Sequence, residues 1–304
     1  MKRALITGIN GFVGSYLEKE LVLHGYTVFG MGREDVQRPH YFHVDVTDEE
    51  KVHDAILEIK PEYIFHLAGI GVPAVAEKDP ELAYKVSVDG TRHVLEAATQ
   101  LEHTPKILVT GTAQVYGTPE YLPIDEKHPL NAKGSYAVSR LDQEKVVASF
   151  SSKLPIVLTR SFNHTGPGQS DDFVIPKILK HIVEIKKGIR ESIELGNIEI
   201  KRDISYVGDV VSAYRLLLEQ DTFFGTVNVC RGESISLKEV VEYGRILAQM
   251  EEIPIIINQA FIRAHDALDL YGDARLLHSI ISWEPRVSYK DLLEKIYQYW
   301  YSIV

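Results

Sequence analysis

A tyrosine and an arginine four residues apart, Tyr136 and Arg140, form a pair that could do chemistry. They lie in a segment predicted to be helical, so their side chains share one helix face. A cation one turn from a phenol stabilises the phenolate, which lets the pair give or take a proton near neutral pH. Thr112, at the end of a predicted strand, could offer its hydroxyl to the same substrate oxygen. The spacing equally suits an exposed i,i+4 pair, and both interpretations stay open at this point.

Three glycines at three-residue spacing, Gly8, Gly11 and Gly14, follow an apolar run at residues 4–7. The run predicts a buried strand, and the apolar residues that recur after the glycines predict a helix. A strand that enters a helix through glycines presents backbone N–H groups at the positive end of the helix, where a pyrophosphate binds. An ordinary turn can also contain three glycines. The position between a strand and a helix favours a dinucleotide site.

Arg33 follows the second predicted strand, residues 26–30, where dinucleotide folds meet the adenosine ribose. An acidic residue there suits the free 2′-hydroxyl of NAD, and an arginine suits the 2′-phosphate of NADP. No acidic residue directly precedes Arg33, which favours NADP, while Glu34 and Asp35 stand close enough to keep NAD possible. A solvated surface arginine is the alternative.

Two further strand ends are predicted to lie near a cofactor. The third strand, residues 41–46, ends in Asp45 and Val46, which could hydrogen-bond the adenine edge, although a turn approaching a helix would look the same. The strand predicted over residues 63–69 ends in small residues, as needed where a backbone passes beneath a cofactor. His66 in this strand is predicted to be a packed, hydrogen-bonded histidine rather than a ligand.

Composition narrows the possible functions. The 304 residues carry a formal net charge of −10, which disfavours non-specific binding to nucleic acid or to an anionic membrane. The single cysteine, Cys230, excludes an internal disulfide and a cysteine-cluster metal site, and we predict no metal. The N-terminus runs directly into the first strand without a signal peptide, and no apolar run is long enough to cross a bilayer, so we expect a cytoplasmic protein.

Strands that alternate with helices along the chain predict an α/β fold, a doubly wound parallel sheet of the Rossmann type with a smaller C-terminal α/β lobe. Ligands in such sheets bind beyond the carboxyl ends of the strands. We expect residues 1–164 to form the NAD(P)-binding domain, with elements around 203–230 returning to it. Residues 165–304 would form most of a discontinuous substrate lobe. Thr47 and Glu50 predict a capping box at the start of one helix.

Several segments together resemble a known family. They are Thr7-Gly8-Ile9-Asn10-Gly11-Phe12-Val13-Gly14, His66-Leu67-Ala68, residues 112–117 and Tyr136. They resemble the extended short-chain dehydrogenase/reductases, and the resemblance covers essentially the whole chain. Further segments look like the GDP-mannose branch, which contains GDP-mannose 4,6-dehydratases and GDP-4-keto-6-deoxymannose reductases. These segments are residues 160–169, 172–177, 195–197 and 201–203, together with Arg263 and Asp266.

Carried over by position, the resemblance implies that Tyr136 is the proton carrier, Thr112 its helper and Arg140 the cation beside the nicotinamide ribose. The expected cofactor-binding residues are Gly8, Asn10, Gly11, Phe12, Val13, Gly14, Arg33, Asp45, Val46, Leu67, Ala68, Tyr136, Arg140 and Phe162. The expected substrate-binding residues are Thr112, Gln114, Asn163, Val174, Lys177, Asn197, Arg202, Arg263 and Asp266. An acidic protein that binds a diphosphate needs convergent cations. This requirement is a reason, independent of the resemblance, to expect Lys177, Arg202 and Arg263 at the diphosphate.

The chain departs from the family pattern at the reacting centre. Arg140 stands where the family has lysine, and its guanidinium keeps the charge but is bulkier and planar. A 4,6-dehydratase uses carboxylates directly after the threonine to move protons at sugar carbons 5 and 6. Ala113 and Gln114 occupy those positions here, and neither is an acid or base at neutral pH, so dehydration is not expected.

We therefore expect an NAD(P)-dependent oxidoreductase acting at C4 of a nucleotide-diphosphate sugar. The most concrete form is a 4-reductase of a GDP-4-keto-6-deoxyhexose, using NADP or NAD. The alternatives are a C4 epimerase or dehydrogenase with tightly bound NAD, and a weakly active nucleotide-sugar-binding homologue, which Arg140 motivates. The resemblance also implies a homodimer, and we expect no nucleic-acid or membrane partner.

Overall fold

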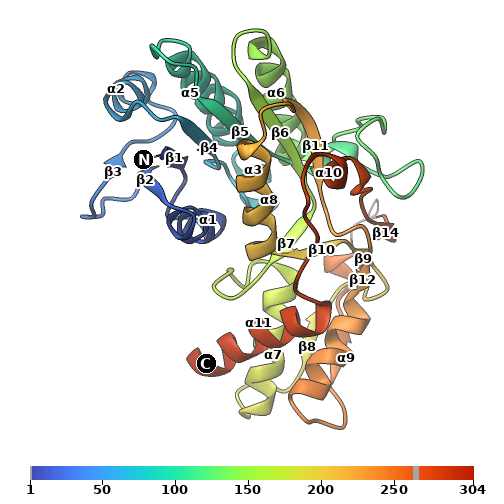
Figure 1. Cartoon of the computed structure of the whole chain (residues 1–304). Coiled ribbons are helices and arrows are strands. Elements are labelled where there is room, and N and C mark those ends of the chain that lie inside the picture. Colours follow the sequence, from blue (N-terminus) through green and yellow to red (C-terminus); the bar gives the residue numbers. More distant parts are fainter. Residues whose placement is uncertain (1, 263–266) are drawn as a thin grey trace.

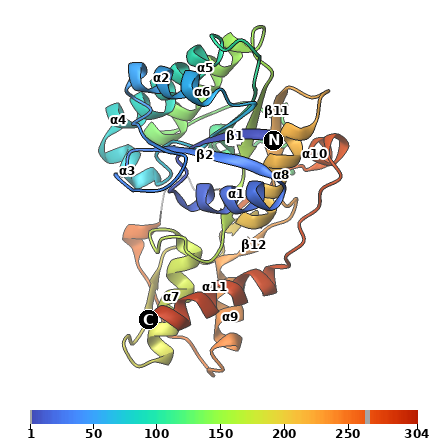
Figure 2. The same ribbon diagram turned by 60° about the vertical axis from the view of Figure 1, so that its left-hand side comes forward.

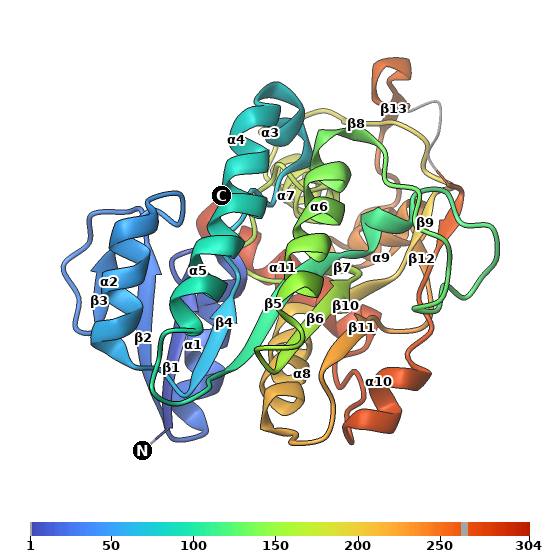
Figure 3. The same ribbon diagram turned by 90° about the horizontal axis from the view of Figure 1, so that it is seen from above.

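The computed structural model describes residues 2–262 and 267–304 (Figure 1). Within that part of the chain, seven strands form one parallel sheet in the order β3-β2-β1-β4-β5-β6-β11, as Figure 3 shows. The strands are β1 (Lys2–Thr7), β2 (Tyr26–Gly32), β3 (Tyr41–His43), β4 (Tyr63–His66), β5 (Lys106–Thr112), β6 (Ile156–Ser161) and β11 (Gly225–Val229). The direction of chain progression reverses between β1 and β4, which is where doubly wound sheets bind their ligands.

Helices cover both faces of this sheet, and Figure 2 shows α2, α5 and α6 above the strands with α1 and α8 below them. One apolar core joins α1 (Phe12–Leu23), α8 (Val207–Glu219) and α10 (Arg275–Ile280) to the sheet. A second core lies on the other face, under α2 (Glu49–Ile59), α5 (Gly90–Ala98) and α6 (Gly134–Phe150). The predicted α/β fold with a doubly wound parallel sheet is therefore confirmed.

A third apolar core lies among the helices at the foot of Figure 1. It is built by α7 (Val174–Lys186), α9 (Leu237–Leu247) and α11 (Tyr289–Ile303). Short strands surround it: β7 (Asn163–Thr165) with β10 (Ile204–Tyr206), β8 (Ile193–Leu195) with β13 (Ile255–Ile257), and β9 (Lys201–Arg202) with β12 (Ile235–Ser236) and β14 (Asp269–Leu270). The proposed division into domains 1–164 and 165–304 stays a prediction.

The remaining helical segments are short and connect longer elements along the chain. They are α3 (Pro73–Lys78), α4 (Pro80–Tyr84), the π-helical turn η1 (Lys85–Asp89) that joins α4 to α5, η2 (Ala113–Tyr116) and η3 (Gln259–Phe261). No helix in the described ranges is long and apolar enough to cross a membrane.

The structure corrects two predicted boundaries near the third strand. The strand β3 ends at His43 rather than at residue 46, and α2 is capped by Asp48, which accepts the N–H of Lys51. Thr47 does not cap the helix because its hydroxyl and its N–H both donate to the carboxylate of Asp45. The predicted Thr47–Glu50 capping box is therefore wrong.

Candidate active site

The glycine-rich turn joins β1 to α1. Gly8 has a φ of 73°, a conformation that favours glycine, and its N–H donates to the carbonyl of Met31. A Cβ on Gly14 would lie 2.4 Å from the carbonyl oxygen of Gly8, so α1 can start this close to β1 only with glycine at that position. Gly11 precedes the first helical residue, Phe12, and no side chain in the described chain caps this N-terminus. The exposed N–H groups therefore fit an anionic group such as a pyrophosphate.

The segment after β4 lies against this turn. Thr7 and His66 are paired at the ends of β1 and β4, and Leu67 and Ala68 follow directly. A Cβ on Gly8 would lie 3.0 Å from both the Cα and the nitrogen of Ala68. The structure thus brings together two stretches predicted separately as cofactor-binding.

At the end of β2, the acidic neighbour of Arg33 faces the turn. Asn10 donates from Nδ2 to the Glu34 carboxylate (3.2 Å) and to the hydroxyl of Tyr41 (3.1 Å). Arg33 is exposed, and its carbonyl accepts a bond from His43. The structure therefore holds Glu34, rather than Arg33, against the glycine-rich turn.

Asp45 and Val46 lie after β3. The Asp45 side chain is exposed and accepts from Thr47, and the carbonyl of the buried Val46 accepts a 2.9 Å bond from His93 Nδ1. Neither observation tests a contact to adenine, so that role stays a prediction.

Tyr136 lies in the first turn of α6, and Arg140 lies one turn further along. The guanidinium carbon of Arg140 is 5.5 Å from the centroid of the Tyr136 ring. Arg140 is only 6% exposed, so the pair is not the surface i,i+4 pair that the sequence left open. From α3, Glu77 accepts the N–H (2.6 Å) and the hydroxyl (3.1 Å) of Ser135, placing an acidic side chain at the positive end of α6. Glu77 therefore fixes the turn that carries Tyr136.

Thr112 ends β5, and η2 follows it. The Thr112 hydroxyl accepts the N–H of Gln114 (3.2 Å), so its own proton can point to another acceptor. The helix α6 packs against both β5 and η2, which brings Thr112 and Tyr136 to the same edge of the sheet. Ala113 is buried and the side chain of Gln114 is exposed, so the two residues after Thr112 offer no carboxylate to this edge.

A buried polar chain runs away from Arg140, and sequence analysis missed it. Arg140 Nη1 donates to Gln143 Oε1 (3.2 Å), and Gln143 Nε2 donates to Thr91 Oγ1 (2.8 Å). His66 Nε2 lies 3.0 Å from the same Thr91 oxygen, and His66 Nδ1 lies 2.8 Å from the hydroxyl of Thr7. The prediction that His66 is a packed, hydrogen-bonded residue is confirmed.

The side chain of Phe162 is buried and does not reach the protein surface. It belongs to a small apolar core with Ala113, Tyr116 and Cys230. Only the backbone of Phe162 is thus left for the predicted contact with a cofactor.

The predicted substrate residues lie around the third core. Lys177 Nζ is 5.4 Å from the centroid of the Phe261 ring. A Cβ on Gly196 would lie 2.8 Å from the Phe261 carbonyl oxygen, so the turn that carries Asn197 lies against the backbone of the same residue. Phe261 is 48% exposed, which makes it an aromatic surface that sequence analysis did not single out.

The other predicted substrate residues are more scattered. Asn163 on β7 and Val174 at the start of α7 are exposed. Arg202 donates from Nη1 to the carbonyls of Lys201 and Ala267, both at 2.8 Å. Arg263 and Asp266 lie outside the described residues.

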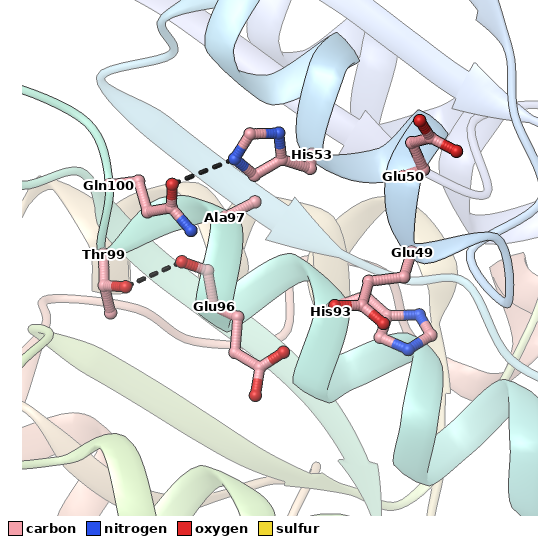
Figure 4. A pocket seen from close by; sticks show the side chains of 8 residues that line it. All are labelled: Glu49, Glu50, His53, His93, Glu96, Ala97, Thr99 and Gln100. Atoms are coloured by element: carbon pink, nitrogen blue, oxygen red, sulfur yellow. Dashed lines mark hydrogen bonds between the residues drawn. The ribbon is translucent and has the colours of Figure 1, made fainter.

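A surface cavity of about 500 Å³ lies between α2 and α5 (Figure 4). It is lined by Glu49, Glu50, His53, His93, Glu96, Ala97, Thr99 and Gln100. The carboxylates in this lining would repel a diphosphate, and the cavity contains none of the predicted site residues. Among the described residues, no group of three or more His, Cys, Asp or Glu side chains is arranged to hold a metal ion.

Known proteins resemble this chain over its whole length. A family model described as GDP-mannose 4,6 dehydratase matches residues 5–296. GDP-6-deoxy-D-mannose reductase of Pseudomonas aeruginosa is 30% identical, with 100% of this chain and 98% of the relative covered. The structure of RMD from Pseudomonas aeruginosa complexed with NADPH is 29% identical, with 100% of both chains covered and a TM-score of 0.89. Thermus thermophilus UDP-glucose 4-epimerase in complex with NAD is 26% identical, with 99% of this chain and 100% of that chain covered and a TM-score of 0.86.

Proposed function

The chain belongs to the GDP-mannose 4,6-dehydratase family, and we propose that it is an NAD(P)-dependent 4-reductase of a GDP-4-keto-6-deoxyhexose. The observation that carries this proposal is the pair Ala113 and Gln114 directly after Thr112, where dehydration would need a carboxylic acid and a base. Ketone reduction needs only one proton donor besides the hydride, and Tyr136 meets that need. The full-length similarity to a GDP-6-deoxy-D-mannose reductase agrees with this choice.

The residues of the site divide the work of such a reduction. Bound NADPH or NADH supplies the hydride that adds to C4 of the sugar. The hydroxyl of Tyr136 donates its proton to the C4 oxygen as negative charge develops there, and the Thr112 hydroxyl shares that oxygen through a hydrogen bond. Arg140 binds hydroxyls of the nicotinamide ribose and stabilises the phenolate that Tyr136 becomes. The glycine-rich turn and the N-terminus of α1 bind the pyrophosphate.

The substrate half of the site is proposed to bind GDP. Lys177 and Arg202 provide positive charge for the diphosphate, and Phe261 offers an exposed ring next to Lys177. Asn163 and Asn197 supply polar groups for the sugar and the nucleotide. These roles are supported by the family pattern and by the contacts that Lys177 and the turn carrying Asn197 make with one residue, Lys177 with the ring of Phe261 and the turn with its backbone.

A C4 epimerase or dehydrogenase with tightly bound NAD is the second candidate. Glu34 favours it, because a carboxylate held at the glycine-rich turn suits a free ribose hydroxyl better than a phosphate. The structural similarity to a UDP-glucose 4-epimerase in complex with NAD is in keeping with this candidate. NAD that stays with the protein through purification would favour this second candidate, and cofactor that exchanges freely would favour the reductase.

We also propose a cytoplasmic homodimer. The resemblance implies contact through two helices per subunit, and α4 and α6, which pack side by side, expose Tyr84 and Val138. Sedimentation equilibrium of the purified protein tests this proposal, with a mass of twice 34.3 kDa expected.

The absorbance of the reduced nicotinamide tests the proposed reaction. The protein is mixed with GDP-4-keto-6-deoxymannose and either NADPH or NADH. We expect one reduced cofactor to be consumed per sugar, and none with GDP-mannose, which has no ketone at C4. Failure to oxidise either cofactor, in protein that demonstrably binds it, would contradict the reductase for this substrate and leave another keto-sugar, the epimerase or dehydrogenase, and the nucleotide-sugar-binding role.

Replacing Glu34 with alanine should shift cofactor preference towards NADPH. The change removes a negative charge that would repel the 2′-phosphate and that could bond the 2′-hydroxyl of NADH. We expect the ratio of the two Kd values to move about tenfold, or about 1.4 kcal/mol, in favour of NADPH. Fluorescence titration of both cofactors measures this ratio. Asp35→Ala, which removes the same charge from the exposed neighbouring residue, serves as the control, and an equal shift in that variant would argue against a specific role of Glu34.

A further inference from the structure

We propose that Gly69 and Gln143 position Arg140 for the cofactor, Gly69 by leaving the space that the guanidinium fills and Gln143 by fixing its orientation. This inference rests on the proposed function, since it explains how the chain can use an arginine where its family pattern has lysine. It assigns roles to two residues outside the expected set of site residues.

The guanidinium of Arg140 occupies the space beside Gly69. A Cβ at residue 69 would lie 2.2 Å from Nη2 and 2.9 Å from both Cζ and Nη1 of Arg140, closer than real Cβ atoms approach other atoms. The backbone of Gly69 lies outside the left-handed region, so its conformation does not itself require glycine. A side chain at residue 69 would therefore displace the guanidinium from the place that it occupies. A lysine at residue 140 would have a single terminal nitrogen and no planar head to accommodate.

Gln143 sets the direction in which the guanidinium points. Arginine can only donate, so the amide oxygen of Gln143 must face Nη1 and its amide nitrogen must face Thr91. Thr91 can accept that bond because its own proton goes to the carbonyl of Ser87 at 2.6 Å. The orientation of the Gln143 amide is thus determined at both ends.

His66 extends the same chain of bonds to the glycine-rich turn. Burial, and then the nearby charge of Arg140, lowers the pKa of His66 to about 3, so its ring is neutral at physiological pH. The Thr91 proton is already used, so His66 Nε2 carries the ring proton and donates to Thr91, and Nδ1 accepts from Thr7. The Thr7 hydroxyl in turn accepts the N–H of Ala68 (3.1 Å). Arg140 is thereby linked to the backbone beside Gly8.

Within the protein, the charge of Arg140 has few partners. In the described part of the chain its guanidinium donates to the neutral amide of Gln143 and to the carbonyl of Ile70, and it forms no ion pair there. Its Nε is buried and finds no acceptor among the described residues. A buried cation that has no carboxylate partner is stabilised when hydrogen-bond acceptors or anions bind to it. The hydroxyls of a bound ribose and the phenolate of Tyr136 are such groups.

A double-mutant cycle tests the role of Gly69. Gly69→Ala is made in the natural chain and in the Arg140→Lys variant, and the Kd of NADPH is measured by fluorescence titration with no substrate present. We expect the alanine to weaken NADPH binding at least about tenfold beside arginine, and less than about twofold beside lysine, as residues in contact are not additive. Gly71→Ala is the matched control, because a Cβ there would meet no described atom within 4 Å. Equal effects of Gly69→Ala in the two backgrounds would overturn the proposal.

Gln143→Leu tests the orienting role. The rate against pH with the keto-sugar should shift its upper limb towards higher pH by about one unit, because a displaced guanidinium stabilises the phenolate less. A lower rate with an unchanged pH profile would show a structural role only and would contradict the proposal. The cofactor titrations remain informative if the keto-sugar proves not to be a substrate, so the two proposals can fail separately.

Discussion

Replacing Tyr136 with phenylalanine is expected to lower kcat by about 10²–10⁴-fold, the usual contribution of a positioned proton donor. The change removes one oxygen from a half-buried ring that sits in the first turn of α6. The ring itself stays beneath the Arg140 guanidinium, so the Kd of NADPH should change by less than about threefold, or less than about 0.7 kcal/mol. Steady-state rates and a cofactor titration on the same preparation measure both quantities.

Tyr121→Phe is the matched control. This tyrosine is exposed, and its hydroxyl donates to Asp125 in the loop after η2. We expect its kcat to equal that of the natural chain. A Tyr136→Phe variant that retains more than about a tenth of the natural kcat would exclude the phenol as the proton donor.

Replacing Glu144 with alanine is expected to lower the free energy of unfolding by about 3–5 kcal/mol, because it leaves a buried guanidinium without its carboxylate. Arg160 binds Glu144 through two parallel bonds, Nε to Oε1 at 3.0 Å and Nη2 to Oε2 at 2.8 Å. The two side chains are only 8% and 9% exposed. Arg160 also donates to the hydroxyl of Tyr116 and to the carbonyl of Glu126. Urea denaturation measures the loss.

The same ion pair holds the helix that carries the proposed proton donor. Tyr136, Arg140 and Glu144 recur every fourth residue, so they follow one side of the helix, and the pair with Arg160 fastens that side to β6. The double variant Arg160→Met/Glu144→Leu removes both charges and should be less destabilised than Glu144→Ala. A loss below about 1 kcal/mol in the single variant, the range of exposed pairs, would contradict the assigned role.

The fold could be predicted because its signals are local. The strand, the glycines and the helix of the first turn are contiguous, and the apolar strands alternate with amphipathic helices along the chain. The exact start of a helix was harder to predict, because neighbouring polar side chains compete to cap it. Asp48 caps α2 because Asp45 takes the hydroxyl of Thr47, and the sequence alone does not show which of the adjacent polar residues wins.

The proximity of Tyr136 and Arg140 could be predicted, but the residues that surround Arg140 could not. The spacing of Tyr136 and Arg140 is a local signal, whereas Thr91, Gly69 and Gln143 come from three separate parts of the chain. In the sequence, Gly69 is one of the small residues expected where a strand end passes beneath a cofactor, and only the position of the Arg140 guanidinium gives this glycine a second role. The spacing of three residues between Arg140 and Gln143 was the one available hint.

The substrate side was the least accessible to sequence analysis. Lys177 and Asn197 could be named from the family pattern, but Phe261 could not, because it lies in the short η3, which follows β13 after a single residue and has no periodic pattern of its own. Its carbonyl meets Gly196 and its ring meets Lys177 only after α7, β8 and β13 have packed together. Contacts of this kind depend on tertiary packing and leave no periodic signal in the sequence.

Transfer of deuterium tests the central claim most directly. The protein is incubated with GDP-4-keto-6-deoxymannose and with NADPH or NADH carrying deuterium at C4 of the nicotinamide, in separate runs for each face of the ring of each cofactor. Proton NMR of the product sugar should show deuterium at C4 in one of the two runs with the cofactor that is used, because the reduction delivers one hydride from one face. A product that carries no deuterium at C4 in any run, or unchanged keto-sugar with both cofactors, would contradict the assignment as a 4-reductase.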